Sequence, residues 1–164
     1  MRYVVGDLCD ALERGEVDAI GHQANCFNTM NSGVAKALRK RWPEVYEADC
    51  RTKKGDPLKF GDLSLATVAT KFGSGLVYNL YGQFNYGYDS KGYTNYAKLE
   101  QSMEAMREDL LTGVGLTHVG FPKIGAGLGG GDWDTIAEII NRVFSDAFDV
   151  TIYVLREEDV PRRS

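Results

Sequence analysis

The sequence has little of the chemistry on which metal-binding and disulfide-rich proteins depend. Its 164 residues include three cysteines and two histidines, and no Cys/His spacing matches a zinc site. We therefore expect no bound metal and no other cofactor. The cysteines are odd in number and unrelated in spacing, which argues against a disulfide framework and favours a reducing, cytoplasmic compartment. They are Cys9, Cys26 and Cys50.

An excess of positive charge and long apolar runs are also lacking. The chain has 19 Lys and Arg against 23 Asp and Glu, so its formal net charge is -4 and its pI is near 5.2. No global basic field exists to hold a nucleic-acid backbone, so duplex binding is not expected. No signal peptide and no long apolar span are evident, so we expect no membrane partner.

What is present fits one globular domain, because 43% of the residues are hydrophobic and 26% are charged. Short apolar or β-branched runs predict strands at 2–5, 17–24, 63–69, 76–80, 116–121 and 150–155. Amphipathic patterns predict helices at 34–42, 44–51, 94–111 and 134–147. This alternation predicts an α/β fold, a three-layer α/β/α sandwich whose mixed, largely parallel sheet has about six strands. We assign 1–155 to the domain and 156–164 to a charged C-terminal tail.

Five glycines lie in residues 121–133, between an expected strand and an expected helix. Asp132 is placed to cap that helix. Glycine lets backbone N–H groups approach a phosphate closely, and a helix N-terminus adds partial positive charge. A phosphorylated ligand is therefore expected, although a short glycine motif alone leaves a ligand-free turn at roughly even odds.

A second loop favours a bound ligand over a ligand-free turn. The polar residues His22, Gln23 and Asn25 gather at the end of the expected strand 17–24, and residues 26–33 are rich in small and amide side chains. Because parallel strands place ligands at their carboxyl ends, we expect both loops to lie at one edge of the sheet. That edge is the predicted binding site.

Four motifs in this order resemble those of a macro domain, the ADP-ribose-binding α/β/α family. They span nearly the whole chain and are Gly6-Asp7-Leu8, Gln23-Ala24-Asn25-Cys26, Asn31-Ser32-Gly33-Val34-Ala35 and Pro122-Lys123-Ile124-Gly125-Ala126-Gly127-Leu128-Gly129-Gly130. Within the family, the chain is most similar to the branch of the yeast ADP-ribose 1''-phosphate phosphatase and its phage and bacterial relatives. In that branch a histidine also precedes the asparagine-cysteine pair, as His22 does here.

The resemblance implies a binding role for each motif. Asp7 would accept a hydrogen bond from the adenine amino group, Leu8 would offer its backbone N–H, and Asn25 would bind the distal ribose. Backbone amides of the two loops would surround the diphosphate and distal ribose. The implied substrate-binding residues are Asp7, Leu8, Asn25, Asn31, Ser32, Gly33, Val34, Ala35, Ile124, Gly125, Ala126, Gly127, Leu128, Gly129 and Gly130. Tyr153 or Leu155 would flank adenine.

The activity that the resemblance implies is metal-independent hydrolysis of ADP-ribose 1''-phosphate to ADP-ribose and phosphate, with His22 and Asn25 as catalytic residues. His22 is the well-placed titratable group of suitable pKa. Attack on phosphorus and protonation of the sugar oxygen are both open to it, and a purely structural histidine is the alternative. Asp89 lies in an aromatic segment, where it either reaches over the site or is solvated. Cys26 is expected to be a buried, inert thiol.

Other functions also fit the resemblance. A related branch removes ADP-ribose from protein or DNA, and its deacylating members use a lysine and an aspartate. Those places hold Gln83 and Gly129 here, so a lysine-adduct mechanism loses its nucleophile. A non-catalytic reader of ADP-ribose and a binder of another nucleotide diphosphate are further alternatives. The expected partner is ADP-ribose or ADP-ribose 1''-phosphate, with nucleic acid expected only as an ADP-ribosylated substrate. The oligomeric state is left open.

Overall fold

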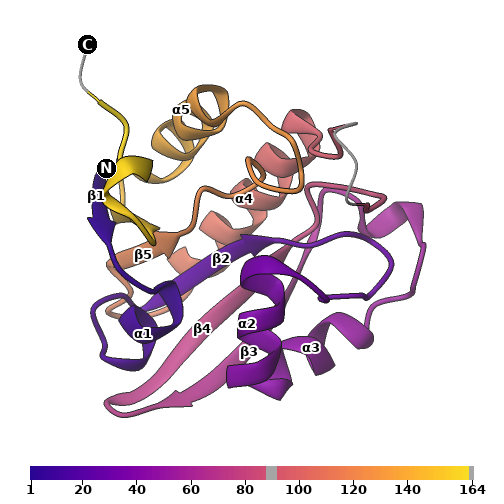
Figure 1. The fold of residues 1–164 in the computed structure, drawn as a ribbon. Helices are drawn as coiled ribbons and strands as arrows, with labels where there is room; N and C mark the ends of the chain where they lie inside the picture. The colour runs from indigo at the N-terminus through magenta and orange to yellow at the C-terminus, as the bar shows by residue number, and fades with distance from the viewer. Residues whose placement is uncertain (88–91, 163–164) are drawn as a thin grey trace.

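The fold is a twisted sheet between two layers of helices (Figure 1). A computed structural model describes residues 1–87 and 92–162. Within them the sheet has six strands in the order β1-β6-β5-β2-β4-β3, parallel except for the antiparallel β3–β4 pair. The strands are β1 (Arg2–Val5), β2 (Ala19–Gln23), β3 (Leu63–Thr70), β4 (Gly73–Leu80), β5 (His118–Phe121) and β6 (Asp149–Val154). The predicted mixed, largely parallel sheet is confirmed.

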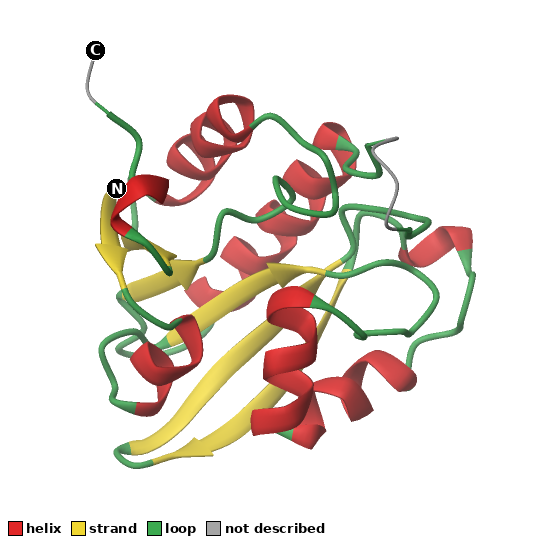
Figure 2. Cartoon of the chain, in the orientation of Figure 1, coloured by secondary structure: helices red, strands yellow, loops and turns green. Residues whose placement is uncertain are grey.

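Helices cover both faces of the sheet (Figure 2). One layer is α1 (Leu8–Glu13), α2 (Gly33–Arg41) and α3 (Pro43–Cys50), and the other is α4 (Tyr96–Leu111) and α5 (Trp133–Phe144). Each layer has its own apolar core. Leu12, Leu38 and Val45 are buried in the first. Met103 and Ile140 are buried in the second, as their helical spacing predicts.

Two local predictions were wrong. Helix α1 was not predicted, because its six residues are too few for a helical period to show. The fourth strand was expected to begin at residue 76, yet β4 begins at Gly73. The reason at Gly75 is packing, since a Cβ there would lie 2.6 Å from Leu12 Cδ1 on α1. The glycine therefore lets α1 approach the sheet closely.

The segment that we assigned to a charged C-terminal tail has local structure in its described part. It forms a short 3₁₀ helix, η2 (Glu157–Asp159), and Val160 packs against the core. The described part of this segment, 156–162, therefore returns to the body of the domain.

The strand order determines where along the sheet the predicted binding site lies. β2 pairs with β4 on one side and with β5 on the other, in the register Ala19↔Val119. The connection after β2 runs toward β4 and β3, whereas the connection after β5 runs toward β6 and β1. Loops that diverge in this way leave a crevice at the carboxyl ends of the strands. The loops 24–32 and 122–132 begin at this point.

Candidate functional site

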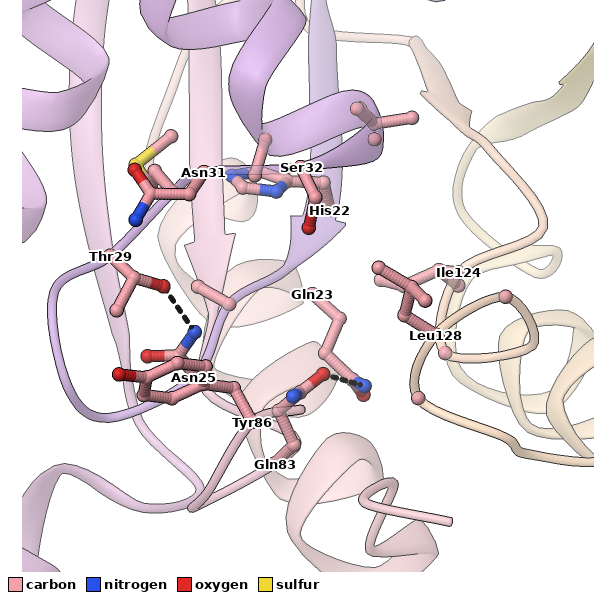
Figure 3. A pocket seen from close by; sticks show the side chains of 18 of the residues that line it. His22, Gln23, Asn25, Thr29, Asn31, Ser32, Gln83, Tyr86, Ile124 and Leu128 are labelled. Carbon is pink, nitrogen blue, oxygen red and sulfur yellow. Dashed lines mark hydrogen bonds between the residues drawn. The ribbon is translucent and has the colours of Figure 1, made fainter. Parts of the chain in front are cut away.

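A cavity of about 390 Å³ lies between the two predicted loops (Figure 3). Its volume is in the range of small-molecule sites. Twelve of the predicted site residues line it, from both loops and from the start of α2. They are His22, Asn25, Asn31, Ser32, Gly33, Val34, Ala35, Ile124, Gly125, Gly127, Leu128 and Gly129. The structure therefore brings the predicted loops together around one space.

Four predicted residues do not line this cavity. Asp7 caps α1, because its carboxylate accepts a hydrogen bond from the Asp10 N–H at 3.0 Å, and Leu8 is buried in the core. Ala126 packs against the core, and Gly130 lies outside the lining with a φ of 69°. The adenine-binding roles of Asp7 and Leu8 remain predictions.

Of the two residues expected to flank adenine, one is buried and one is not. Tyr153 is buried, and a Cβ placed on Gly6 would lie 3.7 Å from its ring. Leu155, in contrast, is 75% exposed. The tyrosine is thus the one that packs beside the turn after β1.

The loop after β5 forms its wall of the cavity from tightly packed backbone. Gly131 donates its N–H to the Gly125 carbonyl at 2.8 Å, and Thr94 Oγ1 donates to the same carbonyl at 2.7 Å. A Cβ on Gly129 would lie 2.4 Å from Thr94 Oγ1 and 2.8 Å from Gln23 Nε2. These contacts leave no room for a side chain at position 129, so an aspartate does not fit there.

A neutral hydrogen-bonded cluster supports this wall. Gln23 Nε2 donates to Gln83 Oε1 at 2.8 Å and to Thr94 Oγ1 at 2.9 Å, and the first of these bonds is drawn in Figure 3. Gln83 and Gly129 occupy the places where the resemblance suggests a lysine and an aspartate in the deacylating branch. The side chains of this cluster are uncharged amide and hydroxyl groups, and the correspondence with the deacylating branch remains a prediction.

The loop after β2 forms the opposite wall and is held by side chains. Asn25 Nδ2 donates to Thr29 Oγ1 at 2.7 Å, while Asn25 Oδ1 accepts from the Phe27 N–H at 2.8 Å. Asn28 has a positive φ of 57°, a conformation that costs energy outside glycine. Lys59 holds it there, because its Nζ donates to Asn28 Oδ1 at 2.6 Å.

The start of α2 lies at the cavity and has no side-chain cap. Ser32 is the N-cap residue, but its side chain makes no capping hydrogen bond, and residues 33–35 line the cavity. At α5, by contrast, Asp132 accepts from the Thr135 N–H at 3.1 Å, as predicted. The first N–H groups of a helix without a side-chain cap are available to an anion.

His22 lies in the wall of the cavity and is only 2% exposed. Its Nε2 is 2.5 Å from Asn79 Oδ1. The Asn79 Nδ2 group donates to the Val45 carbonyl and to Ser64 Oγ, so Asn79 Oδ1 is the acceptor and His22 Nε2 carries the proton. His22 Nδ1 has no hydrogen-bond partner in the part of the chain that the structure describes.

Burial determines the charge of this histidine. Desolvation lowers the pKa of His22 to about 4, and the interactions with the Asn79 side chain and the Gln23 backbone offset that effect only in part. The ring is therefore neutral near neutral pH, with an unprotonated Nδ1.

Sequence reasoning missed several lining residues, among them Thr29, Asp49 and Tyr86. Tyr86 lies in the aromatic segment 81–88, and aromatic residues interleaved with glycine are the signal that could have placed it at the cavity. The rest of that segment is partly structural, because Phe84 packs edge-on against Phe27 at a ring distance of 5.2 Å. Asp89 lies outside the described residues.

The remaining titratable candidates are away from the cavity or inert. His118 begins β5 and pairs with Asp149 at 3.2 Å. Cys26 is buried, as expected, and burial raises the pKa of its thiol to about 11. Among residues 1–87 and 92–162, no group of three or more His, Cys, Asp or Glu is arranged to hold a metal ion. No described helix is long and apolar enough to cross a membrane.

Comparisons with known proteins agree with this geometry. The family model described as Macro domain matches residues 22–140. The "Uncharacterized 17.5 kDa protein in tk-vs intergenic region" of Enterobacteria phage T4 is 33% identical over 153 residues, 93% of this chain and 94% of that protein. The "DNA ADP-ribosyl glycohydrolase" of Mycobacterium tuberculosis is 24% identical over 90% of this chain, which spans 40% of that protein's length.

Solved structures share the fold at lower sequence identity. The structure titled "Thermosipho africanus DarTG in complex with ADP-ribose" matches with a TM-score of 0.76 and 19% identity. The match covers 97% of this chain and 42% of that one.

Proposed function

This chain belongs to the macro domain family, and from that premise we propose that its cavity binds ADP-ribose and that it hydrolyses ADP-ribose 1''-phosphate to ADP-ribose and phosphate. The observation that carries the proposal is the meeting of two anion-binding elements in one cavity. These are the start of α2, which has no side-chain cap, and the glycine loop 122–131. A diphosphate between them would receive backbone N–H groups from both.

Asn25 and His22 are the residues that we assign to the reaction. Asn25 is fixed by its bonds to Thr29 and Phe27, so it can orient the distal ribose. A proton donor with a pKa of about 4 is already deprotonated at neutral pH, so the neutral His22 ring favours attack on phosphorus over proton donation. Nδ1 would form a bond to phosphorus as the bond from phosphorus to the sugar oxygen breaks. Water would then release phosphate from the histidine.

The absence of a charged pair at positions 83 and 129 supports this chemistry. Gln83 and Gly129 cannot form an adduct with the distal ribose or activate one, because neither side chain offers a nucleophile. Phosphoester hydrolysis does not need such an adduct at the ribose carbon.

The test is phosphate release from ADP-ribose 1''-phosphate by the purified protein in chelator, with ADP-ribose binding measured on the same batch. We expect release and binding together. The His22→Asn variant should keep ADP-ribose binding and lose turnover by roughly 100-fold or more, the scale of a removed nucleophile or acid-base group. Binding without release by the parent protein would make the chain a reader or a hydrolase of another ADP-ribose derivative. Turnover of His22→Asn near the parent rate would show that His22 is not catalytic.

A second candidate function is the release of ADP-ribose from nucleic acid, and a groove on α2 favours it. This groove of about 380 Å³ is lined by Lys36, Arg39 and Lys40 together with Met30 and Asn31, and these last two residues also line the main cavity. The three cations form no ion pair with any described residue. A phosphodiester attached to the bound ADP-ribose would find positive charge there.

The matched test is a double variant, Lys36→Gln with Lys40→Gln, against Lys53→Gln with Lys54→Gln as the control. Removing two phosphate contacts should lower turnover of an ADP-ribosylated oligonucleotide roughly 10-fold at low salt, since each contact adds to the salt-dependent affinity. Binding of free ADP-ribose should be unchanged. Equal turnover by both double variants would remove the support for this function.

A further inference from the structure

One carboxyl group in the cavity wall is not accounted for by the binding or catalytic roles above. Asp49 lies near the end of α3, is 0% exposed and lines the cavity. Its Oδ1 accepts a hydrogen bond from the Tyr81 hydroxyl at 2.6 Å. Its Oδ2 is buried and has no hydrogen-bond partner in the described ranges 1–87 and 92–162.

The titratable groups that face Asp49 come from four elements, and none of them neutralises it directly. Lys59 on η1 (Pro57–Lys59) directs its Nζ to Asn28 and Thr52 and forms no ion pair with Asp49. Cys26, from the loop after β2, is held as a thiol by its raised pKa. Tyr46, on α3 itself, has a raised pKa and donates its hydroxyl to the Asn28 carbonyl.

Tyr81 fixes where a proton on Asp49 would be. Burial and the neighbouring carboxyl raise the pKa of Tyr81, so its hydroxyl remains a donor. When Ser64 Oγ donates to the Tyr81 hydroxyl and that hydroxyl donates to Asp49 Oδ1, a proton on the carboxyl group lies on Oδ2. This is the oxygen without a partner.

Physical chemistry favours a proton at that oxygen. A buried carboxylate with one bare oxygen is costly, because water no longer solvates its charge. Burial raises the pKa of Asp49, and the Tyr81 hydrogen bond and the Lys59 charge offset this only in part. Acid-base sites typically contain two titratable groups whose environments shift their pKa values in opposite directions. Here His22 is shifted down and Asp49 is shifted up in the wall of one cavity.

We propose that Asp49 is the acid-base catalyst of this cavity, supplying from Oδ2 the proton that the neutral His22 cannot supply. The inference rests on the proposed phosphatase function. In the first step, His22 Nδ1 bonds to phosphorus, the bond from phosphorus to the sugar oxygen breaks, and Asp49 Oδ2 gives its proton to that oxygen. In the second step, water attacks the phosphohistidine and its proton returns to the Asp49 carboxylate. Phosphate leaves, and both residues are restored.

Asp49→Asn tests this role with little change in shape, since an asparagine oxygen can still accept from Tyr81. The single-turnover rate of ADP-ribose 1''-phosphate cleavage should fall roughly 100-fold or more, the range of general acid catalysis. Affinity for ADP-ribose should be unchanged. The parent rate should decline as the pH rises through the pKa of Asp49, because the acid form is required, and this alkaline limb should be absent in Asp49→Asn. The control is Asp62→Asn, an exposed carboxyl outside the cavity lining.

Tyr81→Phe provides a second readout if Asp49→Asn does not fold. It removes a hydrogen bond that favours the charged carboxylate, so the alkaline limb should move to higher pH while the carboxyl group stays in place. A purely structural Asp49 would leave the limb where it is. An Asp49→Asn rate within about threefold of the parent, with the same pH profile, would overturn the inference, since general acids contribute far more. A parent protein that neither binds ADP-ribose nor releases phosphate would instead contradict the proposed function itself.

Discussion

The two walls of the cavity are built in different ways. The glycine wall (122–131) is backbone, held by the neutral groups of Gln23 and Thr94, and it has no space for a side chain at Gly129. The amide wall (24–32) is held from behind by side chains, and the buried charged groups Asp49 and Lys59 lie against it. The glycine wall is thus suited to bind an anion, whereas the amide wall and its support provide groups that can carry protons.

The largest expected effect is the loss of stability that follows when the pH falls and the buried His22 takes up a proton. The folded pKa of His22, about 4, lies below its ordinary value of 6.5, so the unfolded chain binds more protons between these values. The stability that depends on a neutral His22 is fully present above pH 6.5 and is lost as the pH falls through 4. The loss should approach about 3 kcal/mol of unfolding free energy, at about 1.4 kcal/mol for each pKa unit.

Denaturant unfolding of the parent and of His22→Gln across this pH range measures that loss. The variant should be less stable at pH 7, yet its stability should change less as the pH falls. All other titratable groups are the same in the two proteins, so the difference between their slopes reports on His22. Parallel slopes for parent and His22→Gln would mean that His22 does not titrate as described.

Gly129→Ala tests how tightly the glycine wall is packed at position 129. Its methyl group would meet Thr94 Oγ1 and Gln23 Nε2 at less than contact distance, and overpacking of this kind costs about 1–3 kcal/mol. Gly127→Ala is the matched control, because a Cβ there meets nothing within 4 Å. Thermal unfolding of the two variants should separate them clearly. Equal melting temperatures would show that Thr94 and Gln23 move and accommodate the added methyl group.

Lys59→Met tests the support behind the amide wall. The change removes the hydrogen bonds from Lys59 Nζ to Asn28 Oδ1 and Thr52 Oγ1. Each bond from a charged group contributes about 1.5–3 kcal/mol, less the desolvation that the buried ammonium no longer suffers, so we expect a net loss of about 1–2 kcal/mol. ADP-ribose affinity should fall as well, because the loop loses its fixed shape. Lys54→Met, at an exposed position, should change neither quantity.

The smallest effect is expected at the end of the glycine wall. Asp132→Ala removes the cap of α5, where the carboxylate accepts from the Thr135 N–H and hydroxyl. Loss of such a cap costs about 1 kcal/mol. Asp134→Ala, within the first turn, serves as the control. If both variants unfold at the same denaturant concentration, the cap contributes nothing specific.

The sequence allowed the glycine wall to be predicted but not the support of the amide wall. Glycines, the Asp132 cap and the alternation of strands and helices are local signals, so they could be read along the chain. Asp49 and Lys59 carry no motif of their own. They lie behind the loop after β2 because α3 and η1 pack there, and Asp49 also lines the cavity. This packing depends on the whole fold.

A calorimetric titration of the parent protein and of Asn25→Ala with ADP-ribose asks whether the cavity is an ADP-ribose site. We expect saturable binding at one site per chain, weakened roughly 10-fold in the variant, as expected for one lost hydrogen bond of about 1.4 kcal/mol. No binding by the parent, or equal affinity in Asn25→Ala, would contradict an ADP-ribose site between these two walls.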